Sequence, residues 1–523
     1  MTPERAGHEG QIVRALGSIG SATLASRILG FVRDMVVALA FGAGPITDAF
    51  FVAFRIPNML RRLLAEGALS TAVIPVFTEY HVNRSPADFA RMLRAVLALG
   101  LLALGVATVL GIVLAPWLLP VIAPGFTADP AQAELTVLLT RVMFPYLLLV
   151  GLAALANGVL NTHGRFFAAA LGPALLNLGM IGGVLLLARR VQPPVLALAI
   201  GVLVGGGAQL AAQLPSLRRL GALVAPSSEL RHPAVGRVAR LIPAAVFGLA
   251  AVQVTVFVNT LLASLLPPGS ISFLYYADRL MEFPLGVFGI ALASASLPAM
   301  ARQAAARDDA GVAATLQFAL RLSCYVAMPA TVGLLMLRVP ITRVLFERGR
   351  FGPAATAATA DALAGYAVGL VAFAAARIAA QVFYALGEPG TAVRMGALAV
   401  GANVVAAVAL MQPAGAVGLA LASSIGAWVN LAALMVAARR RLGPGGERGV
   451  AASAVRTLGA SLPLAAWCLL ATRLWPATGR LGDAVTLLIV VAGGGAIFWI
   501  ASVLLAVPER TALREMLPRR RRH

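Results

Sequence analysis

The sequence predicts an all-α polytopic membrane protein, and three observations lead to this prediction. First, 60% of the residues are hydrophobic and only 12% are charged, whereas soluble domains carry about 25% charged residues. Second, apolar stretches long enough to cross a bilayer recur from about residue 15 to residue 507, which leaves no room for a soluble domain. Third, most arginines flank these stretches, as topology signals do.

The apolar stretches predict 14 transmembrane helices. A helix needs about 20 residues to cross ~30 Å of hydrocarbon, and each stretch meets that length. The second stretch is the least regular because Arg55, Arg61, Arg62 and Glu66 interrupt it. The expected spans cover residues 15–42, 46–78, 92–120, 133–160, 166–188, 193–216, 236–265, 271–300, 311–337, 354–385, 391–411, 414–438, 454–475 and 483–507.

The arginines in the connections predict that both termini of this inner-membrane protein face the cytoplasm. The expected outside connections at 117–133, 265–271 and 411–414 contain no arginine, although arginines at 189–190 and 343–350 oppose the trend. The N-terminal residues lack the apolar core of a signal peptide, so we expect the first span to remain in the protein. The expected inside connections hold Arg84, Arg91, Arg165, Arg218, Arg219, Arg231, Arg237, Arg302, Arg307, Arg394, Arg439, Arg440, Arg441, Arg448 and the run at 519–522.

An internal repeat predicts two pseudo-symmetric lobes of six helices each. The segment FFVAFRIPNMLRRLLAEGALSTAVIP (50–75) resembles LYYADRLMEFPLGVFGIALASASLP (274–298). Parallel repeats of this kind are related by an axis along the membrane normal, with the substrate between the halves. Offsets of 223 to 226 persist along the chain and pair Arg55 with Arg279, Pro75 with Pro298, Phe126 with Phe351, and Asn177 with Asn403.

The repeat also predicts the domain boundaries. We expect an N-lobe over residues 1–220 with spans 1–6 and a C-lobe over 221–442 with spans 7–12. Residues 443–523 add two C-terminal helices and a basic cytoplasmic tail.

The composition does not indicate nucleic-acid binding, catalysis or a metal site. The net charge is +21 and every basic residue is arginine, but these arginines lie beside spans rather than on one soluble face. Cys324 and Cys468 lie inside apolar stretches, where we expect packing roles. The five histidines lie in tails and loops, and the Asp308–Asp309 pair reads as a solvated turn. We therefore expect no catalytic residue, no metal and no nucleic-acid partner.

Charged residues inside the predicted spans are the candidate functional residues. Each costs about 2.5–3.5 kcal/mol at the centre of a bilayer and usually faces a cavity or a helix partner. Pairs three or four residues apart, such as Arg62 with Glu66 and Arg279 with Glu282, share a helix face and can neutralise each other. Arg33, Asp34, Arg62 and Glu282 are equally explained as locks between helices. The candidates are Arg27, Arg33, Asp34, Asp48, Arg55, Arg61, Arg62, Glu66, Asp278, Arg279 and Glu282.

Arginine exceeds the nearby acids in these spans, which points to an anionic substrate. The planar guanidinium suits phosphate because it offers bidentate donors. Arg141 and Arg377, in spans 4 and 10, are better explained by snorkelling or by pairing between helices.

The long motifs resemble one known family. SRILGFVRDMVVALAFGAGPITDAFFVAFRIPNMLRRLLAEGALSTAVIPVFTEY (26–80) closely resembles the first two helices of the MurJ/MviN lipid II flippases. YYADRLMEFPLGVFGIALASASLP (275–298) resembles their eighth helix, and NGVLNTHGRF (157–166) fits as well. The similarity covers essentially the whole chain, within the multidrug/oligosaccharidyl-lipid/polysaccharide exporter superfamily.

The resemblance implies a central cationic cavity and a groove on helices 13 and 14 for a polyprenyl tail. By motif, it assigns substrate binding to Arg27, Arg33, Arg61 and Arg279. It assigns gating and charge pairing to Asp48, Arg62, Glu66, Asp278 and Glu282.

The resemblance further implies alternating access without a cofactor. The arginines would hold the pyrophosphate of lipid II, and the acids would pair with them in the state without substrate. Membrane potential, protons or sodium are the candidate energy sources, since a unit charge crossing 100 mV is worth about 2.3 kcal/mol. The expected partners are lipid II, membrane lipids and the cell-wall synthesis machinery.

Two other functions remain open on the sequence. One is a related exporter of another lipid-linked oligosaccharide or of a cationic drug, although a drug exporter would line its cavity with acids. The other is a membrane enzyme acting on polyprenyl phosphates, which would need a cluster of acids that binds a divalent ion at the cytoplasmic interface.

Overall fold

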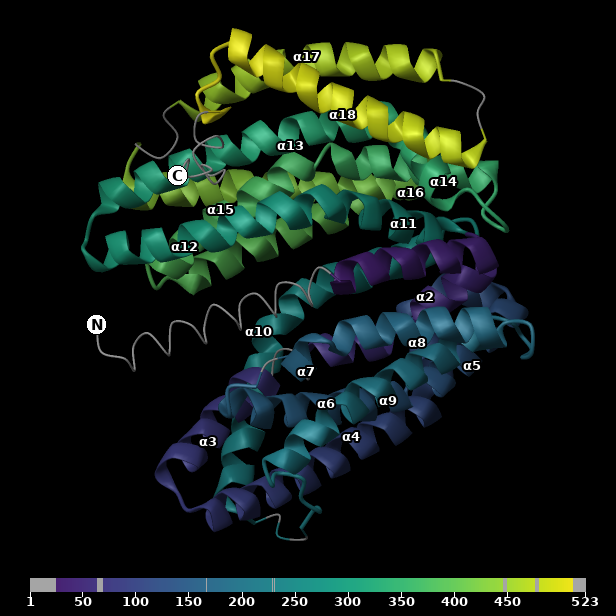
Figure 1. Cartoon of the computed structure of the whole chain (residues 1–523), viewed down its shortest axis with the longest axis vertical. Coiled ribbons are helices and arrows are strands. Elements are labelled where there is room, and N and C mark those ends of the chain that lie inside the picture. The colour runs from purple at the N-terminus through teal and green to yellow at the C-terminus, as the bar shows by residue number, and fades with distance from the viewer. Residues whose placement is uncertain are drawn as a thin grey trace, which may run out of the picture. The chain divides into compact units, whose positions relative to one another are not determined.

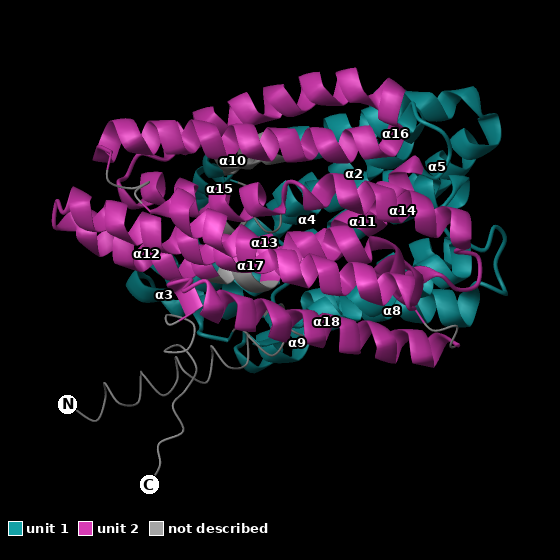
Figure 2. Cartoon of the chain, turned by 90° about the horizontal axis from the view of Figure 1, so that it is seen from above, with its two compact units in different colours: residues 1–269 teal, residues 270–523 magenta. Residues whose placement is uncertain are grey.

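The protein is all-helical over the residues that the structure describes. This computed structural model describes residues 25–63, 69–165, 167–227, 229, 231–444, 449–475 and 479–510, and none of these residues is in a β-strand. Contacts divide the chain into two compact units, Met1–Gly269 and Ser270–His523 (Figure 2). The all-α prediction is therefore confirmed.

The first unit contains eleven consecutive helical elements in its described part. The first is the helix over residues 25–41. It is followed by α2 (Pro45–Arg61), α3 (Leu69–Asn83), α4 (Pro86–Ile122), the 3-10 turn η2 (Pro124–Ala128), α5 (Pro130–Met143), α6 (Pro145–Thr162), α7 (Phe167–Ala170), α8 (Gly172–Leu187), α9 (Leu196–Arg219) and α10 (Pro233–Ser264) (Figure 1).

The second unit contains the remaining helices. They are α11 (Ser270–Pro284), the π-helical turn η3 (Leu285–Gly289), α12 (Ile290–Ala305), α13 (Asp309–Phe346), α14 (Pro353–Ala367), α15 (Leu370–Ala385), α16 (Pro389–Leu442), α17 (Val450–Arg473) and α18 (Arg480–Leu504).

Every predicted span contains helix, but several spans are interrupted. The span expected over 46–78 corresponds to α2 and α3, with residues 64–68 outside the described part. The span over 133–160 is divided at Phe144, and the span over 271–300 contains η3. Among the described residues, seven helices are long and apolar enough to cross a membrane, or up to eight if a bent pair counts as one span.

Donor side chains compensate for one of these breaks. Helices α14 and α15 are bent by 41° at their junction. Ser424 donates to the carbonyl oxygens of Gly365 at 2.7 Å and Tyr366 at 3.3 Å, and the Trp428 indole donates to Val368 O at 3.1 Å. These bonds matter because a backbone carbonyl freed inside a membrane needs a donor from the protein.

Helix α16 consists of two limbs that Gly415 joins. Its φ of 55° and ψ of −133° are non-helical, and a positive φ is readily adopted only by glycine. The two limbs match the separate spans predicted over 391–411 and 414–438.

Equivalent positions of the repeat form the core of each unit. In unit 1 the cluster draws on α3, α4, α6, α9 and α10, and in unit 2 on α12, α13, α15 and α16. Three pairs of residues at offsets of 223 or 224, each no more than 1% exposed, are Phe77 with Met300, Met92 with Leu316, and Val159 with Phe383. This agreement supports the predicted duplication.

Helix α10 belongs to the first compact unit by its contacts. It packs against α3 and α4, and the Arg237 guanidinium binds both carboxylate oxygens of Glu79 at 2.9 and 2.7 Å. This guanidinium holds the pKa of the Glu79 carboxyl below its usual value. The expected lobe boundary between residues 220 and 221 stays a prediction.

The two C-terminal helices pack on α13. A third core cluster joins Tyr325 and Leu337 to Leu464, Phe498 and Val507, and α17 and α18 lie beside α13 (Figure 1). The segment after α18 returns to α13, where Arg321 forms an ion pair with the buried carboxylate of Glu509.

Candidate functional site

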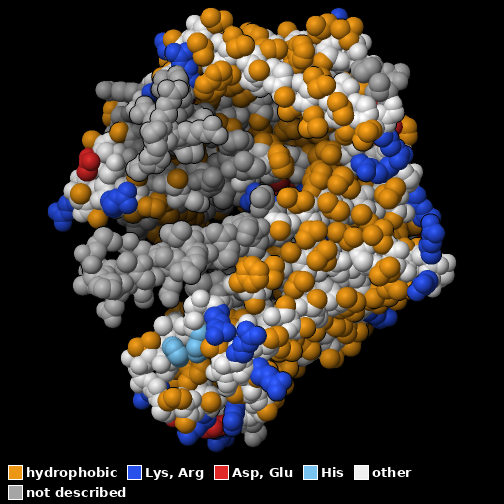
Figure 3. All heavy atoms as spheres, in the orientation of Figure 1, with side chains coloured by type: hydrophobic (Ala, Val, Ile, Leu, Met, Phe, Trp, Pro, Cys, Tyr) orange, Lys and Arg blue, Asp and Glu red, His pale blue; other side chains and the backbone are white. Residues whose placement is uncertain are grey.

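The surface separates apolar helix sides from charged helix ends. In the view of Figure 3, hydrophobic side chains cover the sides of the helices, and arginines gather mainly toward their ends. Exposed Val, Leu and Ile side chains are frequent, especially on α4, α16, α17 and α18. Charged residues within such helices are therefore the features that need a specific explanation.

Arg33 is the most fully bonded arginine of the predicted site. Its Nε and Nη2 donate to Asp34 Oδ1 at 2.9 and 2.6 Å, and its Nη1 donates to Asn177 Oδ1 at 3.0 Å. Asn177 Nδ2 in turn donates to the carbonyl oxygen of Ser26 at 3.1 Å. Arg33 is 8% exposed and Asp34 is 1% exposed. The group fastens the helix over residues 25–41 to α8, as the locking interpretation of Arg33 and Asp34 expects.

Arg27 lies on the same helix but in a different environment. Successive helical residues are rotated by about 100°, so Arg27 and Arg33 point about 120° apart. Arg27 is exposed, and within the described ranges it forms no ion pair or hydrogen bond. Its guanidinium donors are therefore open to an anion.

Asp48 is buried and holds a turn. It is 2% exposed, and its Oδ2 accepts a hydrogen bond from Gly269 N at 2.5 Å, at the turn before α11. Gly269 has a φ of 95°, which favours glycine at this position. Thr47 supports the start of α2 by donating to Gly42 O at 3.0 Å. The predicted gating role of Asp48 stays a prediction.

The arginines at the end of α2 differ in burial. Arg61 is half-buried and donates from Nε to Asn58 Oδ1 at 3.1 Å, whereas Arg62 is exposed. The predicted pairing of Arg62 involves Glu66, which lies outside the described residues. Arg55, one of the interrupting charges, donates to Thr260 Oγ1 and so joins α2 to α10.

Arg279 forms the local ion pair that its spacing predicts. Its Nη1 lies 2.8 Å from Glu282 Oε2, and its Nη2 donates to the Tyr275 hydroxyl at 3.3 Å. The guanidinium carbon lies 5.6 Å from the centre of the Tyr275 ring, a cation–π geometry. Asp278 is half-buried beside it, and α11 ends at Pro284 where η3 begins. The Arg279–Glu282 pair is only partly buried, so a phosphate could replace the carboxylate.

The structure adds two residues that sequence reasoning did not assign to the site. The sequence analysis used Asn177 only to mark the repeat. The sequence feature that could have indicated its role is that it is a polar side chain in the otherwise apolar α8. Tyr275 lies four residues before Arg279, which places both on one helix face. Arg33 and Asn177 are 144 residues apart in the sequence, so their contact could not be predicted from residue spacing.

Arg141 pairs between helices, as one of its two interpretations expects. Its Nε donates to Ile112 O on α4 at 3.2 Å. That carbonyl has no helical donor because the residue four positions later is Pro116, which lacks an N–H. Arg377 on α15 is exposed, as Arg141 is, but over the described residues it forms no hydrogen bond or ion pair.

Three of the candidate arginines have guanidinium groups that an anion can reach. Unit 1 carries Arg27 and Arg61 and unit 2 carries Arg279, each at least partly exposed. Guanidinium groups bind phosphate oxygens in charge-assisted hydrogen bonds. Convergence of the three on one substrate stays a prediction.

Comparisons with known proteins identify the family. The family model described as lipid II flippase MurJ matches residues 37–490. A lipid II flippase MurJ from Burkholderia cenocepacia is 37% identical over 468 residues, which are 87% of this chain and 90% of that protein. A probable lipid II flippase MurJ from Vibrio cholerae is 39% identical over 428 residues, covering 80% of this chain and 81% of its own.

Solved structures show the same fold. The structure described as lipid II flippase MurJ in an inward closed conformation matches with a TM-score of 0.78 and 22% identity, covering 95% of this chain and 99% of its own. An inward-facing multidrug MATE family transporter matches with a TM-score of 0.64 and 15% identity, covering 81% of this chain and 96% of that chain. The match over residues 37–490 and the identities to the curated relatives place this chain in the lipid II flippase MurJ family.

Proposed function

We propose that this protein translocates lipid II, the polyprenyl-pyrophosphate-linked cell-wall precursor, from the cytoplasmic to the outer leaflet. The observation that carries the proposal is the family match over residues 37–490, which includes most of the charged helices of both units. The relatives are named lipid II flippases. An excess of arginine over nearby acids inside apolar helices suits a substrate with a pyrophosphate.

Arg27, Arg61 and Arg279 would contact the pyrophosphate in a cavity open to the cytoplasm. Arg279 would exchange Glu282 for the substrate, and Arg33 would join by releasing Asp34 or Asn177. Asp48, Glu66, Asp278 and Glu282, with Arg62, would supply the opposing charges when the cavity is empty. The Arg279–Glu282 pair supports this exchange because Arg279 already binds a carboxylate, and both side chains are partly exposed, so that a phosphate can compete with Glu282.

Alternating access would proceed by rocking of two six-helix lobes in a bundle of 14 spans. The equivalent cores of the two units support a duplicated frame. The polyprenyl tail would lie along α17 and α18, whose exposed faces carry Leu458, Leu462, Leu488 and Ile489. We place both termini in the cytoplasm, and membrane potential, protons or sodium would supply the energy without a cofactor.

Export of a different lipid-linked oligosaccharide is the second candidate. The likeness to MATE transporters is one of fold, at 15% identity. The arginine-rich charge set favours an anionic lipid over the cations that acidic cavities accept. The choice between lipid-linked substrates therefore depends on an assay of the substrate itself.

The test is depletion of this protein in its host, with lipid II measured on the cytoplasmic leaflet. We expect lipid II to accumulate and cells to lyse, with rescue by the wild type but not by Arg279→Ala, which removes the guanidinium while leaving the helix intact. Arg302→Ala, at the exposed end of α12, is the matched control and should rescue.

Two outcomes would contradict the proposal. Full rescue by Arg279→Ala at wild-type protein levels would remove this arginine from the site. Unchanged lipid II with loss of another surface polysaccharide would transfer the function to the second candidate.

A further inference from the structure

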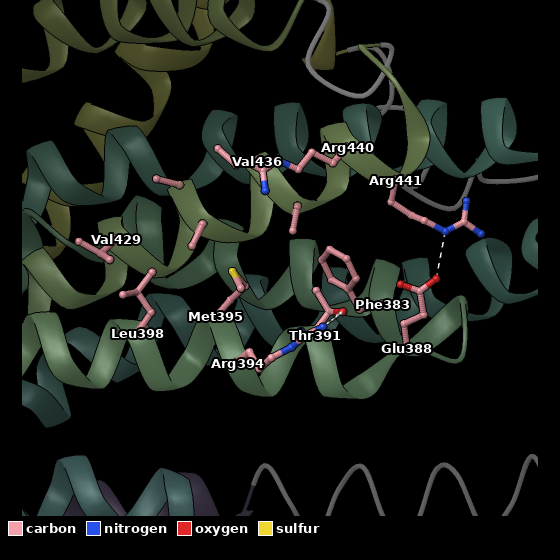
Figure 4. Close-up of a pocket in the computed structure, with 13 residues that line it drawn as sticks. Phe383, Glu388, Thr391, Arg394, Met395, Leu398, Val429, Val436, Arg440 and Arg441 are labelled. Atoms are coloured by element: carbon pink, nitrogen blue, oxygen red, sulfur yellow. Dashed lines mark hydrogen bonds and ion pairs between the residues drawn. The ribbon is translucent and has the colours of Figure 1, made fainter.

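A groove in the second unit is lined by none of the residues proposed to hold lipid II. It has a volume of about 730 Å³ and runs between the two limbs of α16, near the ends remote from Gly415. Met395 and Leu398 line it from the first limb, and Val429 and Val436 line it from the second (Figure 4).

Three arginines line the groove, Arg394, Arg440 and Arg441, and Glu388 lines it beside Arg441. Arg394 is near the start of the first limb and Arg440 is near the end of the second, and both line the groove. Val429 lies about 16 Å from Arg440 along the helix, at ~1.5 Å per residue. That length is close to half of the ~30 Å hydrocarbon thickness. The apolar part of the groove therefore has the depth of one leaflet.

Arg394 and Arg440 have guanidinium donors that no acid among the described residues occupies. Arg394 bonds only within its own helix, to Gly390 O at 3.4 Å and Thr391 Oγ1 at 3.3 Å. For Arg440, the described part of the chain offers no ion pair or hydrogen bond. Their neighbour Arg441 differs, because Glu388 and Asp309 hold it at 3.0 and 3.1 Å.

We propose that this groove binds one anionic phospholipid from the leaflet that contains its arginine end. The headgroup phosphate would lie on Arg394 and Arg440, and one acyl chain would lie between the limbs against Leu398 and Val436. Guanidinium groups bind phosphate, and basic pockets between transmembrane helices recognise anionic headgroups.

The apolar lining selects a lipid over a soluble anion. Leu398 is 56% exposed and Val436 is 51% exposed, and a free phosphate at the arginines would leave both uncovered. An acyl chain covers them, and each CH₂ group that it buries strengthens binding. The charge at one end and the apolar surface below it together match the two parts of one phospholipid.

Native mass spectrometry of the purified full-length protein tests the proposal. The probes are phosphatidylglycerol and phosphatidylcholine with identical acyl chains. We expect one phosphatidylglycerol to be retained in preference to phosphatidylcholine. The double variant Arg394→Gln/Arg440→Gln should weaken its retention by about fivefold for each arginine removed.

Two further variants separate the headgroup from the chain. Ala433→Trp fills the groove without changing its charge and should also abolish the retention, because the acyl chain loses its place. Arg218→Gln/Arg219→Gln removes the same charge from the exposed end of α9, the counterpart in the first repeat, and should leave retention unchanged.

Several results would overturn the proposal. An equal loss in the α9 variant would show general attraction of anionic lipid to arginine, and unchanged retention in Ala433→Trp would show that no chain enters the groove. A mass of two protein chains that disappears in Ala433→Trp would assign the groove to a second copy. None of these readouts depends on lipid II transport, so the proposed function is tested separately.

Discussion

At the scale of single residues, burial separates arginines that hold the fold from arginines that can meet a substrate. Arg33 has its donors occupied by Asp34 and Asn177, whereas Arg27, on another side of the same helix, is exposed. A buried charge is tolerated only when its hydrogen bonds are satisfied. Asn177 is therefore the residue on which the buried position of Arg33 depends.

The first residue-scale prediction concerns Asn177. Asn177→Leu keeps the side-chain volume but removes the acceptor for Arg33 and the donor to Ser26 O. We expect the free energy of unfolding to fall by about 1–3 kcal/mol, because a buried charged donor loses its partner. Chemical denaturation of the purified protein in mixed micelles measures the change.

The repeat provides the control for this experiment. Asn403 occupies the equivalent position in unit 2 and is equally buried, but it bonds only the neutral Ser423 at a long 3.4 Å. Asn403→Leu should cost less than about 1 kcal/mol, since no charge is left unpaired. Equal losses in the two variants would show that Arg33 does not depend on Asn177.

Local pairs could be predicted from the sequence at this scale, and distant ones could not. The Arg279–Glu282 ion pair follows from a spacing of three residues on one helix face. The bond between Arg33 and Asn177 depends on how α8 packs against the first helix, which no spacing encodes. The prediction that Arg33 binds substrate therefore could not foresee that all three of its nitrogens already donate hydrogen bonds.

At the scale of helices, prolines and bends leave backbone carbonyls that side chains from neighbouring helices satisfy. Pro116 leaves Ile112 O without its helical donor, and Arg141 of α5 supplies one. At the bend between α14 and α15, Ser424 and Trp428 play the same part. These bonds explain how interrupted helices persist in an apolar surrounding.

A double-mutant cycle tests this account of Arg141. We expect Arg141→Ala to lower the free energy of unfolding by about 1 kcal/mol, because Ile112 O loses its donor. In a Pro116→Ala background the same change should cost close to nothing, since the restored N–H of residue 116 bonds that carbonyl. Denaturation of the four proteins in mixed micelles gives the coupling.

Arg377 is the matched control for the cycle. Like Arg141, it is an exposed arginine within a predicted span, but it forms no hydrogen bond or ion pair with any residue that the structure describes. Arg377→Ala should change stability by less than about 0.5 kcal/mol in either background. The same cost for Arg141→Ala with and without Pro116 would contradict the proposed role.

The locations of the helices could be predicted because long apolar stretches are a strong signal. The interruptions within the helices could be predicted only in part. Gly415 joins two spans that the sequence already separates, because its neighbours include Pro413 and a polar Gln412. The break at Gly369 lies inside a continuous apolar stretch. There, Ser424 Oγ would lie 2.5 Å from a Cβ at Gly369, a packing constraint from a helix distant in sequence.

At the scale of the whole molecule, duplication gives equivalent cores but different uses of equivalent charges. Arg55 and Arg279 occupy the same position in the repeat. Arg55 binds Thr260 and locks α2 to α10, while Arg279 pairs with Glu282 in a partly exposed setting. A symmetric frame with asymmetric charges suits a substrate that has a charged head and an apolar tail.

The prediction for the whole molecule is the side of the membrane on which each connection lies, because the number of spans determines that side. Thr127 and Gln412 lie in connections expected outside, whereas Glu229 and Ala306 lie in connections expected inside, and all four are exposed. Three predicted spans separate Thr127 from Glu229, two separate Glu229 from Ala306, and three separate Ala306 from Gln412. An odd number of crossings changes the side and an even number preserves it.

Single cysteines at these four positions test the count. The background replaces the two buried cysteines, Cys324 and Cys468, with alanine, which removes only the sulfur atom from each side chain. In intact spheroplasts, a membrane-impermeant maleimide should label Thr127→Cys and Gln412→Cys, and it should label Glu229→Cys and Ala306→Cys only after lysis. If the bent pair α14–α15 were a re-entrant loop rather than a span, Ala306→Cys and Gln412→Cys would label alike. Labelling of Thr127→Cys and Glu229→Cys from the same side would instead remove one crossing from unit 1, and with it the predicted parallel relation of the two repeats.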